Sequence, residues 1–201
     1  MFTYYMPTKV FFGKGCIAQS GEVLADLGRK ALLVTGRHSA KVNGSQAAVV
    51  EKLDELGISW FLFDEVENNP SVATIRKAAA LALEKGVDFV IGIGGGSPMD
   101  AAKAIALVCT QELDDEQLFT GPYRKPLPIV AVPTTAGTGS EVTKVSVLTN
   151  PKAGTKQSIN TPLIFPVYAF ADPAFTESHP SRVRGLKSGG CGPSSGTAGR
   201  R

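Results

Sequence analysis

The chain has 201 residues, of which 43% are hydrophobic and 19% are charged, a composition typical of a single globular domain without a membrane span. Its first residues lack the basic and apolar regions of a secretory signal, so we expect a cytoplasmic protein. The net charge of +3 comes from residues 182–201, which carry five basic and no acidic side chains. Without them, 16 basic residues stand against 18 acidic ones, which argues against a nucleic-acid partner.

Apolar runs alternate with helix-forming segments along the first 132 residues. The predicted strands are Val10–Phe12, Lys30–Thr35, Ile58–Phe63, Val87–Ile93 and Leu127–Val132. The predicted helices are Ile17–Leu27, Ala47–Leu56, Val72–Lys85 and Pro98–Thr110. Continuous apolar strands that alternate with helices are typical of a parallel sheet covered on both faces. The predicted fold class is therefore α/β, a doubly wound parallel-sheet domain.

The pattern changes after residue 132. A polar loop comes first, and then Val142–Thr149 and Leu163–Phe170 predict an added β-hairpin, joined by the turn N-P-K-A-G-T. Residues 182–201 contain six glycines and too few apolar side chains to build a core, so they predict a tail that does not fold. The expected organisation is one domain over residues 1–181, followed by this tail.

The fourth predicted strand runs into Gly94-Gly95-Gly96-Ser97, and a helix follows. Glycines let the backbone approach a phosphate closely, and the free N–H groups at a helix start carry a partial positive charge. Pro98 suits the first helical position, where its missing N–H is not needed. Ser97 stands where the dinucleotide fingerprint has its third glycine, so a tight turn without a ligand stays as the alternative.

A second loop follows the fifth strand and reads T-T-A-G-T-G-S-E over residues 134–141. In open α/β sheets ligands sit at the carboxyl ends of the strands, and this loop falls at such an end. Its four hydroxyls can bind phosphate, ribose or an amide group. A polar connection without a ligand is the alternative, and Glu141 is either a general base or a structural partner of the loop.

A third loop follows the second strand and reads T-G-R-H-S-A-K-V-N-G over residues 35–44. A carboxylate in such a loop usually binds the ribose 2′-hydroxyl of NAD, whereas small and basic residues admit the 2′-phosphate of NADP. This loop holds Gly36, Arg37, Ser39 and Lys41 and no acid, which favours NADP over NAD. A solvated basic loop is the alternative.

The residues of a self-contained catalytic site are missing from the sequence. It shows no Ser/His/Asp set, no paired carboxylates in a glycine-bounded loop and no metal-ligand cluster. His38 and His179 lie far apart, and the three cysteines are too scattered for a disulfide framework. We therefore assign no catalytic residue and no metal ligand.

Five segments occur together in this chain: Y-M-P-T-K-V-F-F-G, F-D-E-V-E-N-N-P, G-G-G-S-P-M-D-A-A-K, P-T-T-A-G-T-G-S-E-V-T and F-P-V-Y-A-F-A-D-P. In this combination the sequence resembles the iron-containing (group III) alcohol dehydrogenases over residues 4–181. The resemblance implies an N-terminal NAD(P)-binding α/β domain and an all-helical domain with a divalent metal, iron or zinc. That metal would bind the alcohol oxygen and polarise the carbonyl.

The resemblance also implies which residues bind the cofactor. Those along the diphosphate are Gly95, Gly96, Ser97 and Asp100. Those lining the path from adenine to nicotinamide are Thr134, Thr135, Thr138 and Ser140, and Lys156 reaches the cofactor ribose. Those around the 2′-phosphate are Gly36, Ser39 and Asn43, since this loop resembles the branch that uses NADP; NAD is the alternative cofactor.

The sequence departs from the family after Asp172-Pro173. The resemblance implies that a helix bearing T-G-x-D-A-L-x-H follows, whose Asp and His are metal ligands. Those places fall near Gly190 and Ser194, and neither ligand is present there. The whole helical domain is expected to be absent. We hypothesise that residues 182–201 are an out-of-frame translation, with a linker or a natural truncation as alternatives.

The predicted function is that of an NADP(H)-dependent oxidoreductase interconverting an alcohol and an aldehyde or ketone, in a catalytically incomplete form. The alternatives are a glycerol dehydrogenase-like enzyme and a dinucleotide-binding module without catalysis. The expected partner is a small alcohol or aldehyde, with self-association into a homo-oligomer. No nucleic-acid or membrane partner is expected.

Overall fold

The protein is described by a computed structural model over residues 1–150 and 154–177, so the predicted tail lies outside the described residues. The main sheet has six parallel strands in the order β1-β8-β5-β4-β2-β3. Their bounds are β1 Lys9–Phe12, β2 Lys30–Thr35, β3 Ser59–Phe63, β4 Phe89–Gly94, β5 Ile129–Pro133 and β8 Tyr168–Ala171. A separate antiparallel hairpin joins β6 Val145–Asn150 to β7 Thr155–Asn160.

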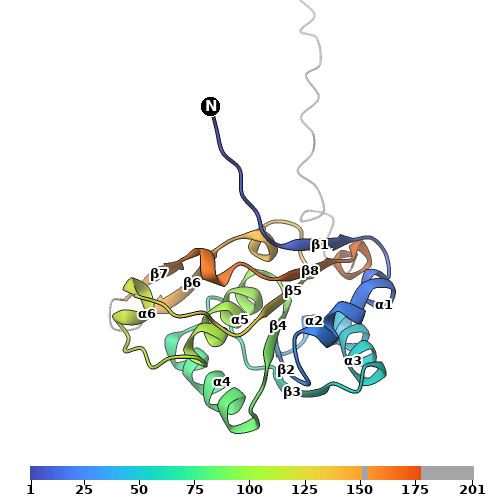
Figure 1. Ribbon diagram of the computed structural model, residues 1–201, viewed down its shortest axis with the longest axis horizontal. Helices are drawn as coiled ribbons and strands as arrows, with labels where there is room; N and C mark the ends of the chain where they lie inside the picture. Colours follow the sequence, from blue (N-terminus) through green and yellow to red (C-terminus); the bar gives the residue numbers. More distant parts are fainter. Residues whose placement is uncertain (151–153, 178–201) are drawn as a thin grey trace, which may run out of the picture.

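Helices cover both faces of this sheet (Figure 1). The α-helices are α1 Cys16–Ser20, α2 Ser39–Val42, α3 Ser45–Glu55, α4 Val72–Lys85, α5 Gly96–Val108 and α6 Gln117–Thr120. Short 3-10 turns are η1 Gly21–Asp26, η2 Ser140–Val142, η3 Pro162–Ile164 and η4 Pro173–Thr176. No helix in the described ranges is both long and apolar enough to cross a membrane.

Alternate residues of β2 pack on opposite faces and so divide the core in two. Leu32 and Val34 pack with the apolar sides of α4 and α5, whereas Ala31 and Leu33 pack with α1 and α3. All four side chains are fully buried. A strand that buries both faces needs an apolar residue at every position, which is why the predicted run reads without alternation. The doubly wound α/β prediction is confirmed.

Glycines let α5 pack directly on β4. A Cβ on Gly92 would stand 2.9 Å from the Cβ of Ala102 and 3.0 Å from the Cα of Met99. Gly94 has a φ of +147°, and its Cβ would stand 2.7 Å from the Cγ of Pro98. A side chain at either position would push the first turns of α5 away from the sheet.

Two helix predictions differ from the structure, one by a break within the helix and one at its start. Residues 17–27 form α1 and then the 3-10 turn η1 instead of one helix, and the break falls at Gly21, whose Cβ would stand 2.6 Å from the Lys52 Cγ of α3. Helix α5 begins at Gly96, so Pro98 is its third residue. The first four N–H groups of a helix have no partner within it, so proline is tolerated there as well.

The predicted hairpin exists, but one of its strands was wrongly assigned. Strand β6 pairs with β7, Thr155–Asn160, and not with the segment Leu163–Phe170. That segment contains η3 and leads into β8, which lies parallel between β1 and β5 in the main sheet. Only Ile159 of β7 is both apolar and buried, so this strand carries little sequence signal.

We expect the variant Gly92→Ala to lower the free energy of unfolding by about 1–3 kcal/mol, because its methyl group overpacks the contact between β4 and α5. Urea unfolding followed by far-UV circular dichroism measures the difference. Gly137→Ala is the matched control, since a Cβ there meets nothing within 4 Å and its φ is not positive. Equal midpoints for the two variants would contradict the close packing at Gly92.

Candidate functional site

Three loops leave the sheet at the same level, at the carboxyl ends of neighbouring strands. Thr35 of β2 pairs with Ile93 of β4, and Gly94 of β4 pairs with Pro133 of β5. The loops that follow these strand ends therefore start side by side. They are the three loops predicted from the sequence. Ligands of open α/β folds bind at this carboxyl edge of the sheet.

The loop after β4, residues 94–97, is called the glycine loop, and the loop after β5, residues 134–141, is called the hydroxyl loop. These two loops are in contact. The Thr134 N–H donates to the Gly94 carbonyl at 2.8 Å. A Cβ on Gly95 would stand 3.3 Å from the Thr135 Oγ1, and one on Gly96 would stand 3.0 Å from the Thr138 Cγ2. The small glycines of one loop therefore let the hydroxyl-bearing loop lie close over it.

A pocket of about 350 Å³ opens beside this contact, at the N-terminus of α5. Its lining residues are Asn69, Gly96, Ser97, Asp100, Thr138, Ser140, Thr143, Val145 and Val147. Five of them were predicted as cofactor-binding, and the structure brings these five together. The α5 N-terminus faces the pocket with unpaired N–H groups, which favour an anion.

Asn69 and Thr143 were missed by the sequence analysis. Asn69 has a φ of 58°, in the left-handed region, and its N–H donates to the Ser97 Oγ at 3.2 Å. The Thr149 Oγ1 of the hairpin donates to the Asn69 carbonyl at 3.0 Å. The sequence analysis named Asn69 only within the segment F-D-E-V-E-N-N-P, because its position beside α5 depends on long-range packing.

Asp100 does not present a free carboxylate to the pocket. Its Oδ1 accepts the Ser140 hydroxyl at 2.6 Å, and its Oδ2 accepts the Val147 N–H at 3.1 Å. Desolvation raises the pKa of Asp100, while these hydrogen bonds and the charge of Lys103 oppose the rise. Both oxygens of Asp100 therefore bind α5 to residues 140–147.

Two of the predicted threonines lie deeper in the second loop. Thr134 is 1% exposed, and its Oγ1 has no hydrogen-bond partner in the described part of the chain. Thr135 is half-buried and helps to line a mostly apolar pocket of about 390 Å³ on the other side of the loop. An orphaned buried hydroxyl at this place is a group that a ligand can satisfy.

Glu141 lies in the wall of that apolar pocket. Its Oε2 is buried and makes no hydrogen bond to any described residue. Asp172 lies in the same wall and has a structural role, because its carboxylate accepts hydrogen bonds from the Gly15 N–H at 2.6 Å and the Ala174 N–H at 2.9 Å. Both roles expected for Glu141, general base and loop partner, stay predictions.

The loop after β2 carries the residues predicted around a 2′-phosphate. Gly36 is half-buried, and Ser39 is exposed at the start of α2. The Asn43 side chain is already used, since its Oδ1 accepts from the Ser45 N–H at 3.0 Å and its Nδ2 donates to the Phe175 carbonyl at 3.3 Å. Asn43 thus accepts the N–H of the first residue of α3 and binds the loop to Phe175.

Charged side chains surround this loop as well. Lys41 forms an ion pair with Asp64, which directly follows β3, with 2.7 Å between Nζ and Oδ2. That hydrogen bond lowers the pKa of Asp64, and the charge of Arg37 contributes. The carboxylate of the neighbouring strand is therefore matched by a basic partner.

Lys156 lies apart from the other predicted residues. It is exposed on β7, opposite Thr149 of β6. Because Thr149 contacts Asn69 at the pocket rim, the hairpin connects Lys156 to the pocket, but no described contact reaches the glycine loop.

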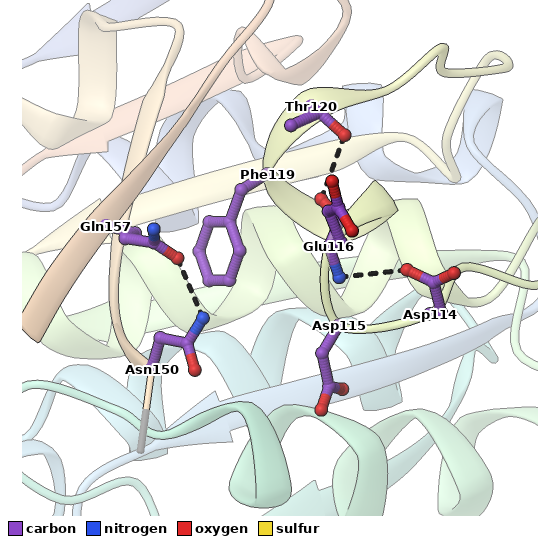
Figure 2. A pocket seen from close by; sticks show the side chains of 7 residues that line it. All are labelled: Asp114, Asp115, Glu116, Phe119, Thr120, Asn150 and Gln157. Atoms are coloured by element: carbon purple, nitrogen blue, oxygen red, sulfur yellow. Dashed lines mark hydrogen bonds between the residues drawn. The ribbon is translucent and has the colours of Figure 1, made fainter. Parts of the chain in front are cut away.

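A further pocket of about 410 Å³ lies between α6 and the hairpin, and Figure 2 shows its lining side chains. Asp114 accepts the N–H groups of Glu116 and Gln117, at 2.9 Å and 2.8 Å, and Asp115 forms an ion pair with Arg76 at 2.8 Å. The carboxylates in its wall make this pocket unfavourable for a diphosphate.

No metal centre is found among residues 1–150 and 154–177. This part of the chain contains no group of three or more His, Cys, Asp or Glu side chains placed to hold a metal ion. The positions where the resemblance implies metal ligands, Gly190 and Ser194, lie outside the described residues.

The chain matches known proteins along most of its length. It is 37% identical over 181 residues to the probable NADH-dependent butanol dehydrogenase 1 of Bacillus subtilis, covering 89% of this chain and 47% of that protein. The crystal structure of an iron-containing alcohol dehydrogenase from Thermotoga maritima superposes with a TM-score of 0.85 at 46% identity, covering 91% of this chain and 51% of that one.

A third comparison carries a bound dinucleotide. The sulfoacetaldehyde reductase from Bifidobacterium kashiwanohense, solved in complex with NAD+, has a TM-score of 0.82 at 34% identity and covers 91% of this chain and 49% of that one. The chain thus spans about half the length of the relatives it matches. The family model described as iron-containing alcohol dehydrogenase matches residues 7–173, and the chain belongs to that family.

Proposed function

We propose that this chain provides the NADP(H)-binding part of an oxidoreductase that interconverts an alcohol and an aldehyde or ketone. The observation that carries the proposal is the contact between the glycine loop and the hydroxyl loop, over the N-terminus of α5. A helix N-terminus beside close-packed glycines is suited to a diphosphate. The relatives named as a butanol dehydrogenase and a sulfoacetaldehyde reductase support an alcohol or aldehyde substrate.

The residues present fit a dinucleotide. Gly95 and Gly96 let the side chains of Thr135 and Thr138 lie close to the backbone at the start of α5, and the buried Thr134 hydroxyl lacks a partner within the described residues. In the proposed complex the N–H groups of Gly96 and Ser97 donate to the diphosphate, and the Thr138 hydroxyl bounds it from the other loop. The bound nicotinamide supplies or accepts the hydride. The role of this chain is to hold and orient it.

The described residues do not fit a divalent metal, because they bring no three ligating side chains together. No step of the reaction is therefore assigned to a metal in this part of the protein. This favours one second candidate function, dinucleotide binding without turnover by these residues alone. Both candidates share the same cofactor site and differ in whether alcohol oxidation accompanies binding.

We propose NADP(H) over NAD(H) on the basis of the loop after β2. The chain leaves that strand through Gly36 and Arg37, with no acid in the loop to bind a 2′-hydroxyl. The carboxylate that directly follows the neighbouring strand β3, Asp64, is paired with Lys41. Several relatives carry NADH in their names, so the proposal depends on the residues of this loop and not on kinship.

The variant Ser97→Asp tests the diphosphate position. An aspartate in the first turn of α5 stabilises the helix by about 0.3–1 kcal/mol through its dipole, whereas its charge repels a diphosphate. We expect NADPH affinity to fall by at least about tenfold, which is about 1.4 kcal/mol, with no loss of melting temperature.

Fluorescence titration with NADPH and a thermal melt measure the two effects, and the neutral variant Ser97→Asn is the control. If Ser97→Asp and Ser97→Asn bind NADPH equally well, the diphosphate does not lie at the start of α5.

The variant Gly36→Asp tests the cofactor preference. A Cβ at Gly36 meets only the Val66 carbonyl, at 3.4 Å, so an aspartate is accommodated. The charge of its carboxylate repels a 2′-phosphate, whereas its oxygens accept a hydrogen bond from a 2′-hydroxyl. We therefore expect the ratio of NADPH to NADH affinity to fall by at least about tenfold. The original chain is expected to bind NADPH more tightly than NADH.

Parallel titrations with the two cofactors measure the ratio, and Gly36→Ala is the control for the added methylene. Tighter binding of NADH than of NADPH by the unmodified chain would contradict the proposed preference.

A further inference from the structure

We propose that Lys103 is a positioning residue, whose buried ammonium fixes the hydroxyl loop over the start of α5 and so maintains the diphosphate site. This inference depends on the proposed dinucleotide function and deepens it. Lys103 is 0% exposed and does not line the pocket, so it does not act as a direct cofactor ligand.

The surroundings of Lys103 satisfy every proton of its ammonium group. Nζ donates to the Val145 carbonyl at 2.8 Å, to the Ser140 Oγ at 2.9 Å and to the Thr143 Oγ1 at 3.3 Å. The Asp100 carboxylate lies 3.9 Å away as a countercharge. A buried ammonium is tolerated only when it is paired and hydrogen-bonded in this way. Ser140 is the last hydroxyl of the hydroxyl loop, and Thr143 and Val145 belong to the chain that directly follows this loop.

Asp100, one turn earlier on α5, binds the same stretch. Its carboxylate accepts from the Ser140 hydroxyl and from the Val147 N–H, and its carbonyl accepts the Ser146 hydroxyl at 2.7 Å. Ser140 Oγ therefore donates to Asp100 and accepts from Lys103. With one proton on that oxygen, this is a single consistent arrangement. Residues 140–147 are thus held to α5 by two side chains of opposite charge.

The hydroxyl loop depends on this attachment because it is fixed mainly at its two ends. At one end the Thr134 N–H bonds to Gly94, and at the other end Ser140 is held by Asp100 and Lys103. Between them, Ala136, Gly137 and Thr138 are exposed. Releasing Ser140 leaves the loop free to leave the glycines that it now contacts.

Burial lowers the pKa of Lys103 to about 8, while Asp100 and Glu141, the charged groups that face it, raise it. A dinucleotide diphosphate bound at the start of α5 adds negative charge and favours the protonated amine. Binding is therefore coupled to proton uptake, so affinity falls as the pH rises above about 8. Stability changes in the opposite direction, because an unfolded lysine holds its proton up to about pH 10.4.

The experiment compares Lys103→Met with the original 201-residue chain. The control is Lys77→Met, which removes an exposed lysine whose ion pair with Glu65 lies on the surface of α4. The probes are NADPH, inorganic pyrophosphate and adenosine 2′-monophosphate, titrated by calorimetry, together with a thermal melt. We expect Lys103→Met to weaken NADPH and pyrophosphate at least about tenfold while 2′-AMP changes less than about twofold, and Lys77→Met to change none of them.

Equal losses for pyrophosphate and 2′-AMP would assign Lys103 a merely structural role and overturn the inference, as would unchanged NADPH binding by Lys103→Met. If Lys103→Met fails to fold, NADPH titrations of the original chain at several pH values test the inference instead. The NADPH affinity is expected to fall severalfold between pH 7.5 and pH 9.5, and an affinity that does not change with pH would overturn the inference. An original chain that binds neither NADPH nor NADH would instead refute the proposed function.

Discussion

The direct packing of α5 on β4 is the constraint on which the rest of the site depends. Gly92 and Gly94 let the helix begin at the edge of the sheet, without an intervening loop that would move it outward. The free N–H groups of its first turn therefore stand level with the ends of β2 and β5. The chain after β5 then needs only to fold over that turn to complete a pocket for an anion.

The hydroxyl loop is fixed by two charged side chains of α5, Lys103 and Asp100. The side chains of Lys103 and Asp100 point from α5 toward residues 140–147, and their hydrogen bonds are to that stretch. In a low-dielectric surrounding such bonds are strong and directional, and leaving one partner out is unfavourable. The glycines provide space for the loop, and the buried pair keeps it in that space.

The sequence predicted most of the sheet and the three loops, for physical reasons that also explain its failures. Strand β2 and helix α4 have the expected bounds. A continuous apolar run marks β2, and the N-cap Ser71 and the C-cap Gly86 mark the two ends of α4. Strand β7 was missed because it buries little apart from Ile159. Lys103 was overlooked because a lysine in a helix normally faces water, and only the tertiary fold brings Ser140 and Val145 to it.

The central claim, that a dinucleotide diphosphate lies where the glycine and hydroxyl loops meet, is tested most directly by amide NMR. NADPH is added to the ¹⁵N-labelled chain, and the chemical-shift changes are assigned to residues. The account predicts that the largest changes occur at Gly95, Gly96 and Ser97 and in residues 134–140. Changes confined to the acidic pocket around Asp114 and Glu116, or no saturable changes at all, would contradict it.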